Sequence, residues 1–175
     1  MVECESANRR EHMIRYDYVT KRREDVKPMD EKQQAWGKKF IKLYTRLNVW
    51  VYKASGGRLM KHFPGGYPIC VLRSKGARTG QWREVALIHL PQGDKELLVA
   101  SLGGMDRNPV WFYNVSANPE VEIFFAGTTR RMRARRVSDE EKAALWPHLL
   151  SLYPDFDEYQ ARTDRNIPVF VCDPL

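Results

Sequence analysis

The chain has 175 residues, 43% of them hydrophobic, which is enough for one globular domain and excludes a disordered or fibrous chain. Its net charge of +7 is concentrated in residues 31–137, whereas residues 138–175 are acidic, so we expect an anionic partner on one face. The three cysteines form no C-x-x-C pair and the four histidines are scattered, so no disulfide framework and no metal site are predicted, and a reducing compartment is expected.

Residues 1–29 are highly charged and weakly patterned, and a flexible arm is predicted there. The arm contains no apolar run, and no stretch of the chain is long and apolar enough to cross a membrane. We therefore expect a cytoplasmic protein without a secretory signal. Residues 30–175 are predicted to form a single domain.

A helix is predicted over residues 30–54, with Asp30 as its N-cap. Its apolar side chains recur at spacings of four and three residues: Trp36, Phe40, Leu43, Leu47 and Trp50. Basic side chains lie between them. Two interpretations stay open: the stripe packs on the domain, which we favour, or the helix lies in the interface of an acidic membrane.

Six strands follow the glycine pairs at 56–57 and 65–66. They are predicted at residues 68–72, 84–90, 96–101, 121–125, 129–137 and 167–172. Helices are predicted between Pro109 and Asn118, from the N-cap Ser138 towards Tyr153, and over residues 155–163. The predicted hairpins join strands that are near one another in the sequence, and helices are inserted late in the chain. This order favours an α+β domain built on a small antiparallel barrel.

The loop between the first two strands, RSKGARTGQWR, is the most informative segment. It combines four cations with two glycines: Arg73, Lys75, Arg78 and Arg83 with Gly76 and Gly80. Glycine permits positive φ and close backbone approach, while cations and exposed amides bind phosphate or carboxylate. A solvated turn is the simpler alternative, but the density of cations favours an anion site.

No motif for hydrolysis, metal binding or mononucleotide binding is present in the sequence. The carboxylates Asp155, Asp157 and Glu158 are clustered, but at a helix start they are favourable partners of the helix dipole. Chemistry supplied by a bound cofactor is therefore favoured, with the protein providing position and electrostatics.

Five short motifs occur in order: G-x-x-T-G-Q-x-R at 76–83, A-S-x-G-G at 100–104, N-P-x-W-F-x-N at 108–114, A-N-P-x-V at 117–121, and the tail at 153–174. Together they resemble the deazaflavin-dependent nitroreductase family over roughly residues 65–174. The resemblance implies a split antiparallel β-barrel of the FMN-binding type, with an N-terminal helix and C-terminal helices. It also implies hydride transfer from reduced coenzyme F420, a deazaflavin with a phosphate and a polyglutamyl tail, to a quinone, activated alkene or nitro compound.

The same resemblance assigns roles to single residues. The phosphate and glutamates would be held by Lys75, Gly76, Arg78, Thr79, Gly80, Gln81 and Arg83. The deazaflavin ring would lie along Ala100, Ser101, Gly103, Gly104, Trp111 and Asn114. The substrate pocket would be bordered by Ile88, Tyr153, Phe156 and Tyr159. Tyr159 or Ser101 would supply the proton, with water as the alternative, and core packing stays open for Trp111.

Two departures and two alternatives accompany this assignment. Ala77 stands where many relatives have a basic residue, and Leu102 stands where a lysine is usual. FMN is the alternative cofactor, because a split barrel with a phosphate loop would serve either. A third interpretation is a non-catalytic binder of acidic lipid or nucleic acid that uses the strand at 130–136 and the lysine-rich helix. The alternation with Met132 and Ala134 fits a half-buried strand equally well, so the predicted partner is a small-molecule acceptor and no nucleic acid.

Overall fold

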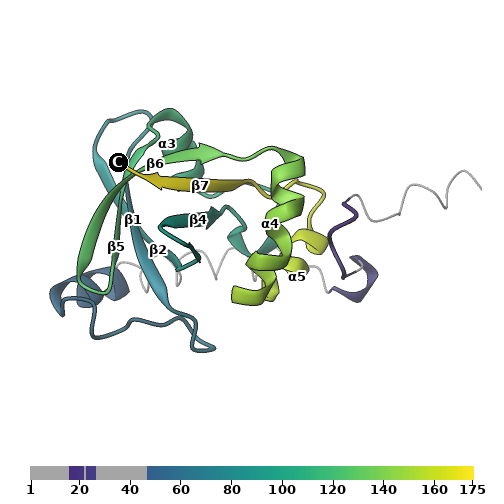
Figure 1. The fold of residues 1–175 in the computed structure, drawn as a ribbon, viewed down its shortest axis with the longest axis horizontal. Helices are drawn as coiled ribbons and strands as arrows, with labels where there is room; N and C mark the ends of the chain where they lie inside the picture. The colour runs from purple at the N-terminus through teal and green to yellow at the C-terminus, as the bar shows by residue number, and fades with distance from the viewer. Residues whose placement is uncertain (1–15, 22, 27–46) are drawn as a thin grey trace, which may run out of the picture.

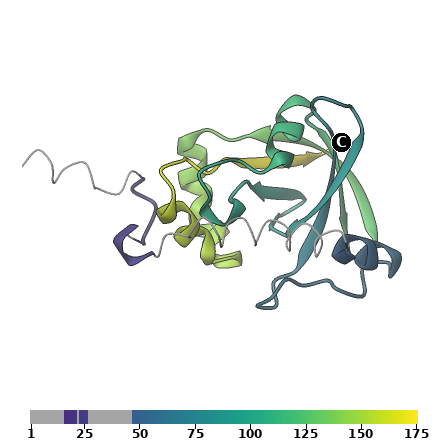
Figure 2. The ribbon, with the colours of Figure 1, turned by 180° about the vertical axis from the view of Figure 1, so that it is seen from behind.

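The structure, a computed structural model, describes residues 16–21, 23–26 and 47–175. Its centre is a seven-stranded antiparallel sheet in the order β2-β1-β5-β6-β7-β4-β3, which curls into an open barrel (Figures 1 and 2). The strands are β1 (Ile69–Lys75), β2 (Trp82–Ile88), β3 (Pro91–Gln92), β4 (Lys95–Val99), β5 (Glu120–Phe125), β6 (Thr128–Arg136) and β7 (Val169–Pro174). The predicted α+β barrel is confirmed.

The helices lie around this sheet. They are η1 (Arg23–Asp25), η2 (Leu102–Gly104), α3 (Val110–Ala117), α4 (Asp139–Leu152) and α5 (Asp155–Arg162), together with a helical stretch at 47–54. Ser138 caps α4 as predicted, because its Oγ accepts a hydrogen bond from Glu141 N at 3.2 Å. Figure 1 shows α4 and α5 together at one end of the sheet, and α3 beside the turn between β1 and β2.

Strand β1 is buried on both faces. Cys70 and Leu72 point into the barrel core, where Met132 and Phe170 also pack. Ile69 and Val71 point to the opposite face and contact the helix at 47–54. This two-sided burial explains the unbroken apolar run at the start of the strand, because alternate strand residues face opposite sides.

The helix at 47–54 docks on the turn between β5 and β6. The Tyr52 ring lies 5.3 Å from that of Phe124, and its hydroxyl accepts a hydrogen bond from Ala126 N at 3.0 Å. A Cβ on Gly57 would lie only 2.6 Å from Gly127 N, so the close approach requires glycine. These contacts fix the end of the helix against the sheet.

The two described residues of the predicted apolar stripe do not face the barrel. Leu47 and Trp50 are 55% and 69% exposed, whereas Val49 and Tyr52 are buried. The favoured interpretation, packing of the stripe on the domain, is therefore wrong for these two residues. The other stripe residues, Trp36, Phe40 and Leu43, lie outside the described residues, as does most of the predicted helix.

Part of the predicted flexible arm packs on the C-terminal helices. Thr20 N and Lys21 N donate to the carboxylate of Asp157 on α5 at 3.0 and 2.8 Å, and Thr20 Oγ1 donates to it as well. Tyr18 lies against Trp146, with ring centroids 5.2 Å apart. The prediction of a flexible arm does not hold for residues 16–21, because a buried carboxylate and an aromatic pair fix them.

Candidate functional site

The basic loop between β1 and β2 closes on its own backbone. Gly76 N donates to Gln81 O and Gly80 N to Gly76 O, both at 2.8 Å. A Cβ on Gly76 would lie 2.9 Å from Thr79 Oγ1, and Gly80 has a φ of 65°, so both positions favour glycine. The side chains of residues 77–80 are left exposed to solvent.

Asn114 on α3 ties this loop to the barrel. Its side chain is buried, and its Oδ1 accepts a hydrogen bond from Ala77 N at 3.0 Å. One turn later, Asn118 Nδ2 donates to Lys75 O at 3.3 Å. The resemblance assigns Asn114 to the deazaflavin ring, but the structure directs its amide oxygen to the loop. Its role here is to position the loop.

Of the four cations of the loop, only Arg73 forms ion pairs with carboxylates of the described residues. Its Nη1 lies 2.6 Å from Glu122 Oε2, and its Nε lies 3.7 Å from Glu84 Oε1. Its guanidinium also covers the ring of Trp82, 4.5 Å from the centroid. Arg73 therefore fastens β1 to its two neighbouring strands and is not free to bind an anion.

The remaining three cations keep their charge available. Lys75, Arg78 and Arg83 form no ion pair with any carboxylate in the described ranges. Lys75 Nζ lies 5.4 Å from the Trp82 ring centroid, and Arg83 donates to Gln81 Oε1 at 3.1 Å. Exposed cations on a turn with internal backbone hydrogen bonds suit the binding of phosphate or carboxylate, and the anion site stays a prediction.

A groove of about 520 Å³ opens beside the loop. Its lining includes both cations and carboxylates: Lys75, Trp82, Ala117, Asn118, Pro119, Glu120, Val121, Glu122 and Arg131. The predicted substrate residues do not line it. The groove therefore offers space next to the anion site and is distinct from the predicted substrate pocket.

The segment at 100–108 is held by one arginine that no sequence pattern singled out. Arg165 donates to Ala100 O at 3.1 Å, Ser101 O at 2.9 Å and Met105 O at 3.1 Å. It also donates to Asn108 Oδ1 at 2.7 Å. The arginine lies in the tail motif, but its partners are about 60 positions earlier in the chain. Only the fold shows that it shapes this segment.

The two glycines of this segment have different surroundings. A Cβ on Gly104 would lie 2.7 Å from Tyr159 O, so the close approach here is to α5. The resemblance places Gly104 along the ring, but the structure explains it by helix packing. Gly103 has a φ of 66°, and its carbonyl accepts a hydrogen bond from Arg162 Nη1 at 2.8 Å. Arg162 Nε is buried and has no partner among the described residues.

The two predicted proton donors, Tyr159 and Ser101, lie near this glycine turn. Tyr159 Oη is 3.0 Å from Tyr153 Oη, and both side chains are half-buried. Burial raises the pKa of both phenols, and for Tyr153 the hydrogen bond to Tyr159 raises it further. Both are therefore protonated at neutral pH. The hydroxyl of Ser101 has no hydrogen-bond partner in the part of the chain that is described.

Two of the other predicted site residues, Trp111 and Phe156, are more deeply packed than the tyrosine pair. Trp111 is 7% exposed and packs in the barrel core near Phe170, which agrees with its structural alternative. Phe156 is 3% exposed, with its ring 4.8 Å from that of Tyr153. Ile88 is half-buried at the end of β2. Phe156 thus packs against the rings of both Tyr153 and Tyr159.

The comparisons with known proteins agree with one another. A family model described as F420H(2)-dependent quinone reductase matches residues 44–174. An F420H(2)-dependent quinone reductase of Mycobacterium tuberculosis is 37% identical over 129 residues, which cover 72% of this chain and 87% of the relative. A structure described as an F420-H2 dependent reductase aligns with a TM-score of 0.57 at 36% identity, covering 61% of this chain and 94% of its own.

A second solved structure, described as a domain-swapped dimer, aligns with a TM-score of 0.58 at 33% identity. It covers 71% of this chain and 97% of its own. Within the described ranges, no helix has the length and apolar character needed to span a membrane.

Proposed function

Because the chain belongs to the F420H(2)-dependent quinone reductase family, we propose that it reduces a quinone-type acceptor and binds its coenzyme between the β1–β2 loop and the segment at 100–104. Coenzyme F420 supplies the hydride when bound, and the protein supplies position and charge. The observation that carries this placement is a set of three cations on a turn that Asn114 holds in place: Lys75, Arg78 and Arg83 pair with no carboxylate of the described residues. FMN remains only an alternative.

The residues around the placement act in distinct ways. The exposed cations bind the phosphate and the glutamates of the tail. Arg165 fixes the carbonyl groups of Ala100 and Ser101, so the wall beside the ring has a defined shape. Tyr153 and Tyr159 border the acceptor, and Tyr159, Ser101 or water delivers the proton. Proximity of the coenzyme to the acceptor then accounts for most of the rate.

A fluorescence titration with deazaflavin, and separately with FMN, tests this placement. We expect tight binding of the deazaflavin with its glutamyl tail and weak binding of FMN. Arg78→Ala and Arg83→Ala should each weaken deazaflavin binding by about 1.5–3 kcal/mol, because each removes a charge-assisted contact. Arg58→Ala removes an exposed cation elsewhere and serves as the control. Unchanged affinity in both loop variants would contradict the anion-loop assignment.

A second proposal concerns contact of the protein with a membrane surface. Leu47, Trp50 and Leu59 are each more than half exposed, and the cations Arg58 and Lys61 are exposed near them. Exposed apolar side chains with a basic rim favour reversible contact with an anionic membrane surface, where lipid-soluble quinones are dissolved. Residues 47–61 lie at the opposite end of the molecule from α4 and α5 (Figure 1).

A further inference from the structure

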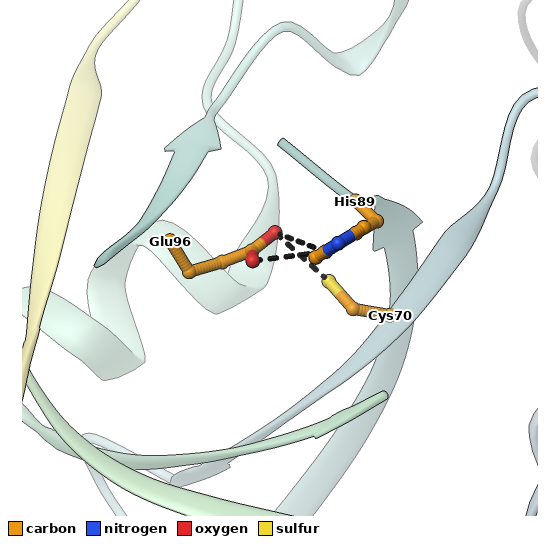
Figure 3. A group of neighbouring side chains, drawn as sticks. All are labelled: Cys70, His89 and Glu96. Carbon is orange, nitrogen blue, oxygen red and sulfur yellow. Dashed lines mark hydrogen bonds and ion pairs between the residues drawn. The ribbon is translucent and has the colours of Figure 1, made fainter. Parts of the chain in front are cut away.

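Three side chains with metal-binding atoms meet at the end of the barrel away from the basic loop (Figure 3). Cys70 lies near the start of β1, His89 directly follows β2, and Glu96 is the second residue of β4. Their ligand atoms all lie within 4.8 Å of one another. Cys70 and Glu96 are buried, and the His89 side chain is 15% exposed.

The three groups are already turned toward one another. His89 Nδ1 is 2.9 Å from one Glu96 carboxylate oxygen and 3.1 Å from the other. Cys70 Sγ is 3.7 Å from Glu96 Oε1. The imidazole is stacked on Phe125 with ring centroids 3.6 Å apart, and Leu90 N donates to Glu96 Oε1 at 2.7 Å. Both the ring and the carboxylate are thus fixed in orientation.

From this geometry we propose that Cys70, His89 and Glu96 bind a divalent transition-metal ion of the zinc class. Sulfur, nitrogen and carboxylate oxygen are the donors that zinc takes in proteins. With metal–ligand bonds of about 2.0–2.3 Å, a tetrahedral site has ligand atoms roughly 3.4–3.6 Å apart. The ligand atoms of His89 and Glu96 are 2.9 Å apart and those of Cys70 and Glu96 are 3.7 Å apart. Since all three lie within 4.8 Å of one another, shifts of about 1 Å or less bring them to the spacing of the site.

The charges of such a site also balance. A thiolate and a carboxylate carry two negative charges, which neutralise a divalent ion, and a buried neutral cluster avoids the cost of an unpaired charge. A carboxylate only accepts hydrogen bonds, so without metal the imidazole points a hydrogen at Glu96, and the Cys70 thiol points its hydrogen at Glu96 Oε1 or at Ile88 O, 3.7 and 3.9 Å away. The ion takes the place of these hydrogens. The competing interpretation is that the three groups are only a hydrogen-bonded link between strands.

The position of the cluster predicts what the ion does. It would connect β1, the end of β2 and β4, three segments of the barrel wall, at the end away from the β1–β2 turn. Metal binding should therefore raise the stability of the barrel, and it is independent of the coenzyme proposal. The sequence gives no sign of the site, because its residues come from separate strands and have no local ligand spacing.

Titration of the full chain with Co²⁺, in a Cys4→Ser background, tests the proposal. We expect one ion per chain, a thiolate-to-cobalt charge-transfer band, displacement by Zn²⁺, and a higher melting temperature with metal. Cys70→Ser should remove the band and weaken binding by more than the roughly 10–100-fold that loss of a supporting residue costs. Cys172→Ser is the matched control. Cys172 is also fully buried in the barrel, and its backbone lies opposite that of Glu96 in the register of β4 and β7.

His89→Gln provides a second variant, because His89 is partly exposed and its replacement leaves the core thiols in place. It should weaken Co²⁺ binding even if Cys70→Ser does not fold. The absence of a band in the parent chain, a band that survives in Cys70→Ser, a band lost only in Cys172→Ser, or unchanged affinity in His89→Gln would each overturn the proposal.

Discussion

Arg165 and Asn114 act on the candidate site through its backbone. Arg165 donates four hydrogen bonds to residues 100–108, and Asn114 accepts one from Ala77 in the basic loop. Each residue therefore fixes one of the two segments that the coenzyme is proposed to touch. Rigid segments bind with a smaller loss of conformational entropy than mobile ones.

Tyr159→Phe separates binding from proton transfer. The substitution keeps the ring and removes the hydroxyl that faces Tyr153, so coenzyme affinity should be retained. Turnover of a water-soluble quinone should fall by about 10²-fold, the low end for a general acid, because the raised pKa of Tyr159 makes it a weak proton donor. Steady-state kinetics with separate kcat and KM values measure this.

Tyr153→Phe is the control for that experiment, since it breaks the same 3.0 Å hydrogen bond from the other side. If both variants lose the same activity, the pair acts through position and not through a proton from Tyr159. An unchanged rate in Tyr159→Phe would assign the proton to Ser101 or to water.

Lys142 makes stability depend on pH. It is 2% exposed, its Nζ donates to Gln160 Oε1 and Asn166 Oδ1 at 2.8 and 2.6 Å, and burial lowers its pKa to about 7. In the unfolded chain a lysine has a pKa of about 10.4, so above pH 7 the unfolded state binds a proton that the folded state has lost. The free energy of unfolding should therefore rise between pH 7 and pH 8.

Urea unfolding at several pH values across this range measures the effect of Lys142. Lys142→Met keeps most of the side-chain volume and should flatten the rise. The measurement stops at pH 8 because of the cysteines. Burial raises the pKa of Cys70 and Cys172, so at higher pH the unfolded state loses thiol protons that the folded state keeps, and the free energy of unfolding falls. A rise that persists in Lys142→Met would contradict the assignment.

Among the elements, the contact of residues 16–21 with α5 depends on one carboxylate. Asp157 is 3% exposed and accepts hydrogen bonds from Thr20, Lys21 and Trp146. Asp157→Ala should lower the free energy of unfolding by roughly 2–4 kcal/mol, because several donors lose a charged acceptor. It should also expose the bond after Lys21 to trypsin, which peptide mapping of a short digestion detects.

Glu158→Gln is the matched control for Asp157→Ala. It leaves Asp157 in place and weakens two partly exposed ion pairs of Glu158, with Lys21 at 3.4 Å and with Arg162, which should cost less than about 2 kcal/mol in total. Equal stability of the two variants would show that residues 16–21 are not held by Asp157.

Most elements follow from local pattern. The six predicted strands, α3, the capped α4 and α5 are all present, because alternating apolar residues, proline–asparagine breaks and a serine cap act within a few residues. Strand β3 is not among the predicted strands, since its two residues are too few for any pattern and pair only because β4 lies beside them. The outward orientation of Leu47 and Trp50 likewise depends on which helix face meets β1.

At the scale of the whole molecule, the exposed apolar residues at 47–61 predict binding to vesicles. The full chain should co-sediment with anionic vesicles and dissociate at high salt, because screening weakens the attraction of its cations. Trp50→Ala should lower this binding by about 10-fold, the effect of removing one large apolar side chain from the interface. Tyr113→Ala, which alters an exposed aromatic residue on α3, is the control. Equal binding of Trp50→Ala and the parent chain would rule out this contact.

The sequence by itself determined the α+β barrel, which follows from periodicity and turn residues, and the family, which follows from five motifs in order. It also predicted the basic loop as an anion site, because the cations are adjacent in the chain. The tertiary structure alone decided which cations stay unpaired, since Arg73 meets Glu122 and Glu84 only when β1 lies between β5 and β2. It likewise decided that Arg165 shapes the segment at 100–108 and that Cys70, His89 and Glu96 converge. Contacts between residues far apart in sequence arise when the sheet curls, and no local pattern encodes them.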